Sequence, residues 1–589
     1  MNELLNKIYN LNNFISEAVW GAPLILLIFF TGIYFTVRSG FFQIKHVKLI
    51  TKSTFLSLFK KDTTKSRDKA SVSQFQALST ALAATIGTGN IAGVATAITF
   101  GGPGAVFWMW ISAVFGMMTS FAENTLGIYY RRKNEKNEWY GGAMYYINDG
   151  LNEKFHCKIL NKLLAGLFCV FCIIASFGVG NMTQSNSIAD ACQTSFGIPA
   201  VISGSIIMII CGFVIIGGTN RICKVTEKLV PFMAICYILL TVTVFIANLK
   251  HFPYVFSSII KCAFSFSAIG GGISGSIVKR AVSTGIKRGI SSNEAGMGSS
   301  VTINAASDVT EPVIQGMWGM FQVFIDTIVI CTLTAFCLLC VNNNAPSANK
   351  ILNNITTENQ VFALTDSPPL ISDKPNNISI KTDKNGNCIL LEEKPELKNY
   401  LTVKIYDKYY YIETLPESSQ ITFSNIMSVR ANPVKNTNGK IVYDENKNPI
   451  VNSLTFSQID GVSLVCYSLS QQFGSFAGQL LAVIIVLFAF STIVGWSFYG
   501  VRAFEYLFGS KAVIVYKIIF TCFILVGSLA NLSLVWSISD NMNAFMAIPN
   551  IIAVLALSGT VIKILNNYLL RKKHKNIKPL INFYENLYK

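Results

Sequence analysis

The stretch Ala83–Gly93, AATIGTGNIAG, decides the fold. It lies inside an apolar run at about 73–99, long enough to cross the ~30 Å hydrocarbon layer as a helix. Three glycines, Thr88 and Asn90 interrupt this run. Unwound backbone is tolerated at that depth only where it is buried in protein or lines a cavity. A glycine-rich packing face is the alternative, but packing does not require Thr88 and Asn90. We therefore predict a broken membrane span whose open carbonyl and amide groups form a binding site.

A second interruption follows at Ser291–Ser300, SSNEAGMGSS, within a Gly- and Ser-rich span at about 275–306. Two interrupted spans in one chain are typical of a transport site at the interface of two repeats. If the first apolar run is set aside, the breaks fall in the first and the sixth of ten remaining spans. This spacing predicts two five-span halves of inverted topology.

Composition places most of the chain in lipid. Of its 589 residues, 51% are hydrophobic and 13% are charged, and the mean hydropathy is +0.45. Soluble domains carry about 25% charged residues. We expect an all-α polytopic membrane protein with about eleven transmembrane helices. Arg38 and a basic stretch follow the first run, which predicts a retained helix rather than a cleaved signal peptide. The uninterrupted apolar runs lie at about 20–37, 103–130, 163–190, 200–217, 229–248, 313–340, 474–500, 512–532 and 543–565.

The charge distribution predicts an orientation in the membrane. The net charge is +17, but residues 341–462 hold 12 Lys/Arg against 13 Asp/Glu, so the excess lies in short loops beside apolar spans. This pattern indicates cytoplasmic loops, not nucleic-acid binding. We expect a multi-pass protein of the bacterial inner membrane, with the N-terminus outside and the basic tail 571–589 in the cytoplasm. The cations at 279–288 do not fit this alternation, and an amphipathic helix at the interface would explain them.

Residues 341–462 differ in composition from the predicted transmembrane core, 1–340 and 463–570. Tyr400–Tyr406 and Lys408–Ile412 alternate in polarity and predict a hairpin around Asp407. Asn438–Gly439, followed by Ile441–Tyr443, predicts a second turn and strand. By parity we expect an extracytoplasmic β-rich insert, an elaborate loop more than a module that delivers substrate.

Five motifs closely resemble the alanine or glycine:cation symporter family. They are ATIGTGNIAGVATAITFGGPG (84–104), GGAMYY (141–146), FGVGNMTQS (177–185), SNEAGMG (292–298) and FSTIVGWSFYG (490–500). The resemblance covers nearly all of the chain apart from its ends and the insert. It implies a leucine-transporter-type fold, in which one extra helix precedes a five-plus-five inverted repeat. It also implies sodium-coupled uptake of alanine or glycine by alternating access, with sodium as the coupling ion and no cofactor.

The resemblance implies the following substrate contacts. The carboxylate of the amino acid would meet the first break at Thr88, Gly89 and Asn90. Its ammonium would meet the second break from Asn293 to Gly296. Gln184 matches a glutamine with which the family contacts substrate, although a hydrogen bond to a neighbouring helix is the alternative.

Three residues near the end of the apolar run at 474–500 complete the expected site. Trp496 lies one turn beyond Thr492, so its indole could cap a small pocket, whereas a tryptophan near a span end can also be an interfacial anchor. Ser491 and Thr492 would bind sodium together with the carbonyls of Ala83 and Ile86, as the resemblance implies. Hydroxyls bonded back to their own helix are the alternative.

Competing functions remain open at this point. Glu123 and Glu294 are the carboxylates that we place nearest to the membrane interior, and proton coupling through either is the rival to sodium. We favour a structural role for Glu123 and a gating or helix-stabilising role for Glu294. A channel would also use a polar broken helix. An enzyme is not expected, because the sequence holds no nucleophile–base constellation, HExxH motif or phosphate loop.

Overall fold

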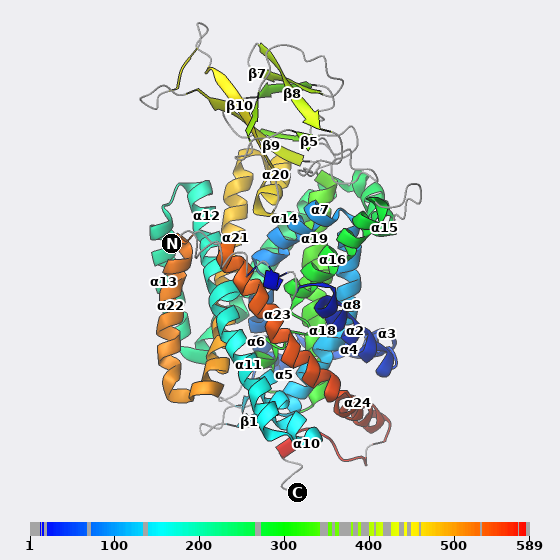
Figure 1. Ribbon diagram of the computed structural model, residues 1–589. Helices are drawn as coiled ribbons and strands as arrows, with labels where there is room; N and C mark the ends of the chain where they lie inside the picture. The colour runs from blue at the N-terminus through cyan, green and yellow to red at the C-terminus, as the bar shows by residue number, and fades with distance from the viewer. Residues whose placement is uncertain are drawn as a thin grey trace.

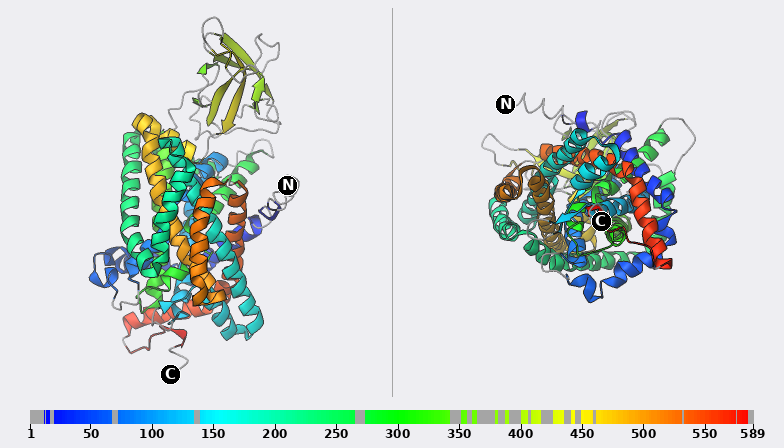
Figure 2. Two further views of the ribbon diagram at one scale, coloured as in Figure 1. Left: turned by 90° about the vertical axis from the view of Figure 1, so that its left-hand side faces the viewer. Right: turned by 90° about the horizontal axis from the view of Figure 1, so that it is seen from below.

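The computed structural model is a bundle of long helices with a β-rich segment at one end (Figures 1 and 2). Its last helix and the marked C-terminus lie at the end opposite the strands (Figure 1). The structure describes residues 12, 14–16, 20–66, 72–133, 139–264, 273–341, 351–355, 360–363, 379–380, 387–389, 400–405, 408–415, 426–434, 441–443, 449–458, 461–530, 533–574 and 576–584.

Within these residues, seven helices are long and apolar enough to cross a membrane, and an eighth span is a bent pair of helices. The chain is therefore a polytopic helical membrane protein, while the count of eleven stays a prediction. The seven spans are α8 (Gly104–Tyr129), α11–α12 (Lys158–Phe196), α14 (Gly218–Ala247), α18–α19 (Pro312–Val341), α21 (Ala477–Phe508), η9–α22 (Ser510–Leu529) and most of α23 (Ser533–Ala556). The shorter helices include α2 (Ala22–Arg38), α13 (Ala200–Ile216), α15 (Phe252–Phe264) and α20 (Gly461–Phe473).

The first predicted break is confirmed. Helix α6 (Gln74–Thr85) begins at a capping box, in which the Ser73 hydroxyl accepts from the Gln76 amide and the Gln76 side chain accepts from Ser73. After α6 the chain forms a short 3₁₀ turn, η2 (Thr88–Asn90), and then α7 (Ala92–Gly101). The two halves of the span are bent by 62°. The glycines at the break thus end one helix and re-aim the next.

The second predicted break is also present, with a shorter second half. Helix α16 (Ile273–Asn293) ends at the predicted position, and only one helical turn follows, α17 (Val301–Asn304). Glu294, Gly296 and Gly298 have φ angles of 57°, 95° and 74°. Such left-handed conformations stop a helix, and only glycine adopts them at little cost.

The cations at 279–288 lie on α16, which packs along α8, so they belong to the first half of the interrupted span. Lys279 and Arg280 are exposed. The Lys287 ammonium lies 5.0 Å from the centre of the Trp20 ring. Asp540 on α23 lies close enough to Lys287 and Arg288 to interact with both charges. The position of these cations at the membrane interface stays a prediction.

The segments next to the two breaks are tied together at the end that carries the basic loops. Val72, just before α6, forms a parallel β-bridge with Ser307, which follows α17. The buried Arg131 guanidinium donates to the carbonyls of Ser307 (2.6 Å), Val309 (2.5 Å) and Ala305 (3.2 Å). The chain just before the first interrupted span and the chain just after the second are therefore bonded to each other and to the end of α8.

The apolar run predicted at 543–565 is divided by the structure. Helix α23 ends at Ala556 and a separate helix, α24 (Ser558–Lys573), follows. Lys563, Asn566 and Asn567 lie on α24, so the second half of the run is too polar to continue the span. Arg571 of α24 forms a two-bonded ion pair with Glu311, at 2.7 and 2.6 Å.

The insert contains two four-stranded sheets, ordered β4-β9-β10-β6 and β3-β7-β8-β5. The predicted hairpin around Asp407 is confirmed, because β7 and β8 pair antiparallel up to Ile405 and Lys408. The predicted turn at Asn438–Gly439 lies outside the described residues, and Tyr443 forms only an isolated bridge with Pro449. The strands are β3 (Ile351–Ile355), β4 (Gln360–Ala363), β5 (Ser379–Ile380), β6 (Asn387–Ile389), β7 (Tyr400–Ile405), β8 (Lys408–Leu415), β9 (Ile426–Pro433) and β10 (Val451–Gln458).

Candidate functional site

Asn90 joins the two breaks. Its side-chain oxygen accepts from the Gly87 amide at 3.0 Å, which replaces a helical bond lost at the first break. Its side-chain nitrogen donates to the Ser292 hydroxyl at 3.0 Å, at the end of α16. Asn90 is fully buried. The Asn90 side chain therefore stabilises both breaks, because its oxygen and its nitrogen each already form a hydrogen bond.

Thr88 and Gln184 lie together, as predicted. The Thr88 hydroxyl donates to the Gln184 side-chain oxygen at 3.2 Å, and the Gln184 nitrogen donates to the Val179 carbonyl at 3.0 Å. Both residues are buried, whereas Gly89 beside them is exposed. A Cβ added to Gly89 would meet no other atom within 4 Å. Open space thus lies next to the backbone of the first break.

The four predicted sodium ligands lie where α21 crosses the end of α6. The Ser491 hydroxyl is 3.5 Å from the Ala83 carbonyl. A Cβ added to Gly87 would lie 2.6 Å from the Thr492 hydroxyl, so Thr492 packs directly on the break. Ile86 ends α6, and its amide donates to the Leu82 carbonyl. Both hydroxyls also donate back to the Phe488 carbonyl, at 2.8 and 3.0 Å, as the alternative interpretation expects.

Trp496 lies inside the bundle. Only 1% of it is exposed, so it is not an anchor at the lipid headgroups. Its Cβ would lie 2.3 Å from a Cβ added to Gly180, in the π-helical turn η4 (Gly178–Met182). The indole packs edge-on against Tyr499 and forms a side-chain hydrogen bond with Glu294. Trp496 therefore connects α21 with the span of Gln184 and with the second break.

At the second break, the structure separates the two predicted residues. The Asn293 amide donates to the Thr327 hydroxyl at 3.0 Å, on the side of the break that faces Asn90. Gly296 instead contacts α2 and α23: its carbonyl accepts from Asn550 at 2.8 Å, and an added Cβ would meet Ile28 at 2.9 Å. Asn293 thus lies beside the first break, and Gly296 does not contact it.

Glu123 and Glu294 both lie at the second break. Glu123 accepts from the Asn550 side chain, which in turn donates to the Gly296 carbonyl at 2.8 Å, and its carboxylate lies close to the backbone of Gly296 and Gly298. Glu294 accepts from the Ser299 hydroxyl at 2.5 Å, across the non-helical segment. Both carboxylates thus contact the second break, where the expected structural role of Glu123 and the gating or helix-stabilising role of Glu294 stay predictions.

Asp326 was missed by the sequence analysis, which placed only Glu123 and Glu294 nearest to the membrane interior. It is fully buried in a π-helical segment, η6 (Phe324–Cys331), between α18 and α19. Its carboxylate accepts from Ser292 at 2.7 Å, from Thr327 at 2.9 Å and from Asn90 at 2.8 Å. A lone aspartate in the apolar run at 313–340 was the signal that could have found it.

The chemistry of this region is that of oxygen ligands and peptide dipoles. Hydroxyls, carbonyls and side-chain amides suit a hard monovalent cation and the two charged ends of a zwitterion. Within the described residues, no group of three or more His, Cys, Asp or Glu could hold a metal ion.

Comparison with known proteins identifies the family. The profile of the sodium:alanine symporter family matches residues 5–365 and 448–582. The chain is similar to the sodium/alanine symporter AgcS of Methanococcus maripaludis, with 34% identity over 94% of this chain and 95% of that protein. It is 32% identical to the probable sodium/glutamine symporter GlnT of Bacillus subtilis, over 97% of this chain and 92% of that protein. The putative sodium/proton-dependent alanine carrier protein YrbD of Bacillus subtilis is 41% identical over 55% of this chain and 63% of that protein. The chain therefore belongs to the sodium:alanine symporter family.

Proposed function

We propose that this protein couples the entry of sodium to the uptake of a small neutral amino acid, alanine or glycine, by alternating access. The observation that carries the proposal is the bond from Asn90 to Ser292, which brings two broken helices together inside the bundle. The name of the relative AgcS supports alanine as the substrate. The overall arrangement that we infer is one extra helix before two inverted five-span repeats, as in the leucine-transporter type.

In this proposal the amino acid lies beside Gly89. The exposed backbone there and the Thr88–Gln184 pair receive the carboxylate, while the end of α16 at Asn293 receives the ammonium. Trp496 limits the length of the side chain that can enter. A buried indole that packs directly on Gly180 leaves little room to move, which supports a small substrate.

Sodium lies between α6 and α21, held by the carbonyls of Ala83 and Ile86 and the hydroxyls of Ser491 and Thr492. The 3.5 Å approach of Ser491 to Ala83 supports this set of ligands. An ion at this position fastens α21 to the broken span in one arrangement. Its inward gradient then drives the amino acid with it, because binding favours that arrangement.

Proton coupling is the second candidate. Glu123, Glu294 and Asp326 are buried, and none of them forms an ion pair with a cation in the described part of the chain. A buried carboxylate without a cation is costly to ionise and can carry a proton instead. The name of the relative YrbD, which includes both sodium and proton, supports keeping this candidate.

Uptake of radiolabelled alanine into proteoliposomes tests the proposal. We expect an inward sodium gradient to stimulate uptake and a proton gradient alone to have little effect. Unlabelled glycine should compete, whereas leucine should not, and glutamine tests the selectivity suggested by the relative GlnT. Uptake that follows the proton gradient without sodium would contradict the proposal. Failure to exchange labelled for unlabelled alanine would favour a channel instead.

A further inference from the structure

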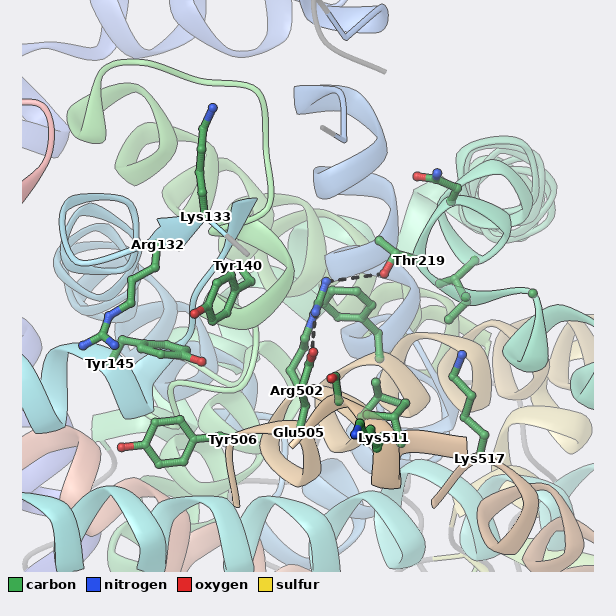
Figure 3. A pocket seen from close by; sticks show the side chains of 18 residues that line it. Arg132, Lys133, Tyr140, Tyr145, Thr219, Arg502, Glu505, Tyr506, Lys511 and Lys517 are labelled. Carbon is green, nitrogen blue, oxygen red and sulfur yellow. Dashed lines mark hydrogen bonds and ion pairs between the residues drawn. The ribbon is translucent and has the colours of Figure 1, made fainter. Parts of the chain in front are cut away.

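A basic cavity lies at the end of the bundle opposite the insert. Its volume is about 880 Å³, and Figure 3 shows the side chains around it. It is surrounded by Gly217 and the start of α14, the end of α21, the start of α22 and the strands β1 (Arg132–Lys133) and β2 (Trp139–Tyr140). The predicted substrate and sodium residues are not among those that line it. It is therefore a separate feature of the molecule.

Positive charge dominates this cavity. Five of its lining residues are cations, and Glu505 is the one acid among them. Arg502 is neutralised by Glu505 at 2.7 Å, and Arg132 by Asp149 at 2.5 Å. Lys133, Lys511 and Lys517 form no ion pair with a carboxylate in the described part of the chain. Three uncompensated cations around one cavity attract an anion.

The cavity opens beside helix faces that contact lipid. Helices α13 and α22 pack side by side, and each reaches the cavity, at Gly217 and at Val513. Apolar side chains are exposed along both helices directly next to it: Phe213 by 69%, Ile216 by 54%, Ile514 by 48% and Ile518 by 52%. Tyrosines, which favour the membrane interface, line the cavity itself. A soluble anion would contact only the lysines. A lipid would contact the lysines through its headgroup and the exposed apolar side chains through its acyl chains, so it accounts for both features.

We propose that the basic cavity binds the headgroup of an anionic phospholipid, with its phosphate beside Lys511 and Lys517 and its acyl chains along α13 and α22. Basic pockets between transmembrane helices on the cytoplasmic side bind such headgroups. The Arg502–Glu505 pair forms one wall and donates a bond to Thr219 at 3.5 Å, which ties α21 to the start of α14. The site is independent of the amino-acid site, so its test does not depend on the proposed transport.

Native mass spectrometry of the purified full-length protein tests the proposal, with phosphatidylglycerol and phosphatidylcholine as the two probes. We expect the wild-type protein to retain phosphatidylglycerol in preference. The double variant Lys511→Gln, Lys517→Gln should lose at least about tenfold in affinity for it, since each cation near the surface contributes ~1 kcal/mol to binding. Lys511→Gln alone should show a partial loss, which covers the case in which the double variant does not fold.

The control is Lys250→Gln, because Lys250 is an exposed lysine at the other end of α14. It should retain phosphatidylglycerol like the wild type. Equal retention of the two lipids by the wild type would overturn the proposal, as would retention that is unchanged in both cavity variants or equally reduced by Lys250→Gln. Displacement of phosphatidylglycerol by millimolar inorganic phosphate would show that the cavity binds a soluble anion, and it would overturn the proposal of a lipid site.

Discussion

At the scale of single residues, the Asn90 side chain is already hydrogen-bonded within the protein, and its predicted contact with substrate stays a prediction. The resemblance implies that it contacts the substrate, whereas its side chain bonds to Gly87, Ser292 and Asp326. A substrate would have to displace these bonds to reach the amide. Gly89, which has no side chain and open space beside it, is the better position for a ligand to approach the backbone.

Thr492→Ala tests the sodium site. The change removes one of the proposed oxygen ligands together with the bond to Phe488. We expect the sodium concentration for half-maximal alanine uptake to rise about fivefold, since one hydrogen bond or ligand contributes ~1 kcal/mol. Uptake at saturating sodium should change less. Thr241→Ala is the matched control, because the Thr241 hydroxyl is buried and donates only to carbonyls of its own helix. Equal effects of the two variants would contradict the assignment.

Trp496→Ala tests the limit on substrate size. Removal of the indole opens space beside Gly180, so leucine should begin to compete with labelled alanine. Competition assays in proteoliposomes measure this change. Trp318→Ala is the control, since Trp318 is equally buried but donates its indole hydrogen bond to Gln74, at the start of α6. Unchanged selectivity in active Trp496→Ala protein would remove the tryptophan from the proposed site.

At the scale of elements, both breaks depend on side chains from other helices. Asn550 on α23 bonds to Glu123 on α8 and to the Gly296 carbonyl of the second break, and Asn90 bonds to the end of α16. The composition of the two segments was sufficient to predict where the helices stop. It did not identify these distant partners, because one sequence does not say which helices will be neighbours.

Glu123→Ala tests the importance of the second break for stability. The change leaves the Asn550 side chain, which also holds the Gly296 carbonyl, without its carboxylate acceptor. We expect the free energy of unfolding to fall by about 1–3 kcal/mol, because a buried polar group left unsatisfied costs that much. Glu123→Gln keeps one acceptor oxygen and should lose less. Thermal unfolding in detergent measures both, and a sodium-driven uptake that survives in Glu123→Gln would argue against proton coupling through this residue.

The candidate site could be predicted in part. Thr88 with Gln184, and Ser491 and Thr492 with the end of α6, lie together as the motifs imply. Gly296 lies on the far side of its break, because the left-handed turn directs it towards α2 and α23. Asp326 was overlooked although a lone aspartate in an apolar run is a signal, and its partners Asn90 and Ser292 come from distant segments that one sequence does not bring together.

At the scale of the whole molecule, hydropathy predicted the positions of the spans well. The run at 543–565 was the exception, since one helix ends at Ala556 and a separate helix, α24, follows and packs on α8 and α18. Residues 543–556 are apolar and those beyond them are of mixed polarity. Their averaged hydropathy therefore resembled that of one segment long enough to span the membrane. The orientation in the membrane and the inverted repeat remain predictions.

Deletion of the insert tests whether transport needs it. Its strands lie at one end of the bundle, and the family profile omits residues 366–447 (Figure 1). We expect a protein in which a short Gly/Ser linker replaces residues 364–447 to take up alanine at a rate within about twofold of the wild type, since long surface insertions are tolerated thermodynamically. Uptake by matched amounts of folded protein is the measurement. A large rise in the alanine concentration for half-maximal uptake would instead give the insert a part in substrate delivery.

The cradle of carbonyls around Arg131 has a consequence for the transport cycle. Any opening of the basic end has to separate Val72 from Ser307 or draw this guanidinium away from its three acceptors. A guanidinium does not lose its proton in proteins, and a peptide oxygen carries none. These hydrogen bonds therefore do not depend on pH. A ligand bound in the centre of the protein, rather than a proton, would have to control when they break.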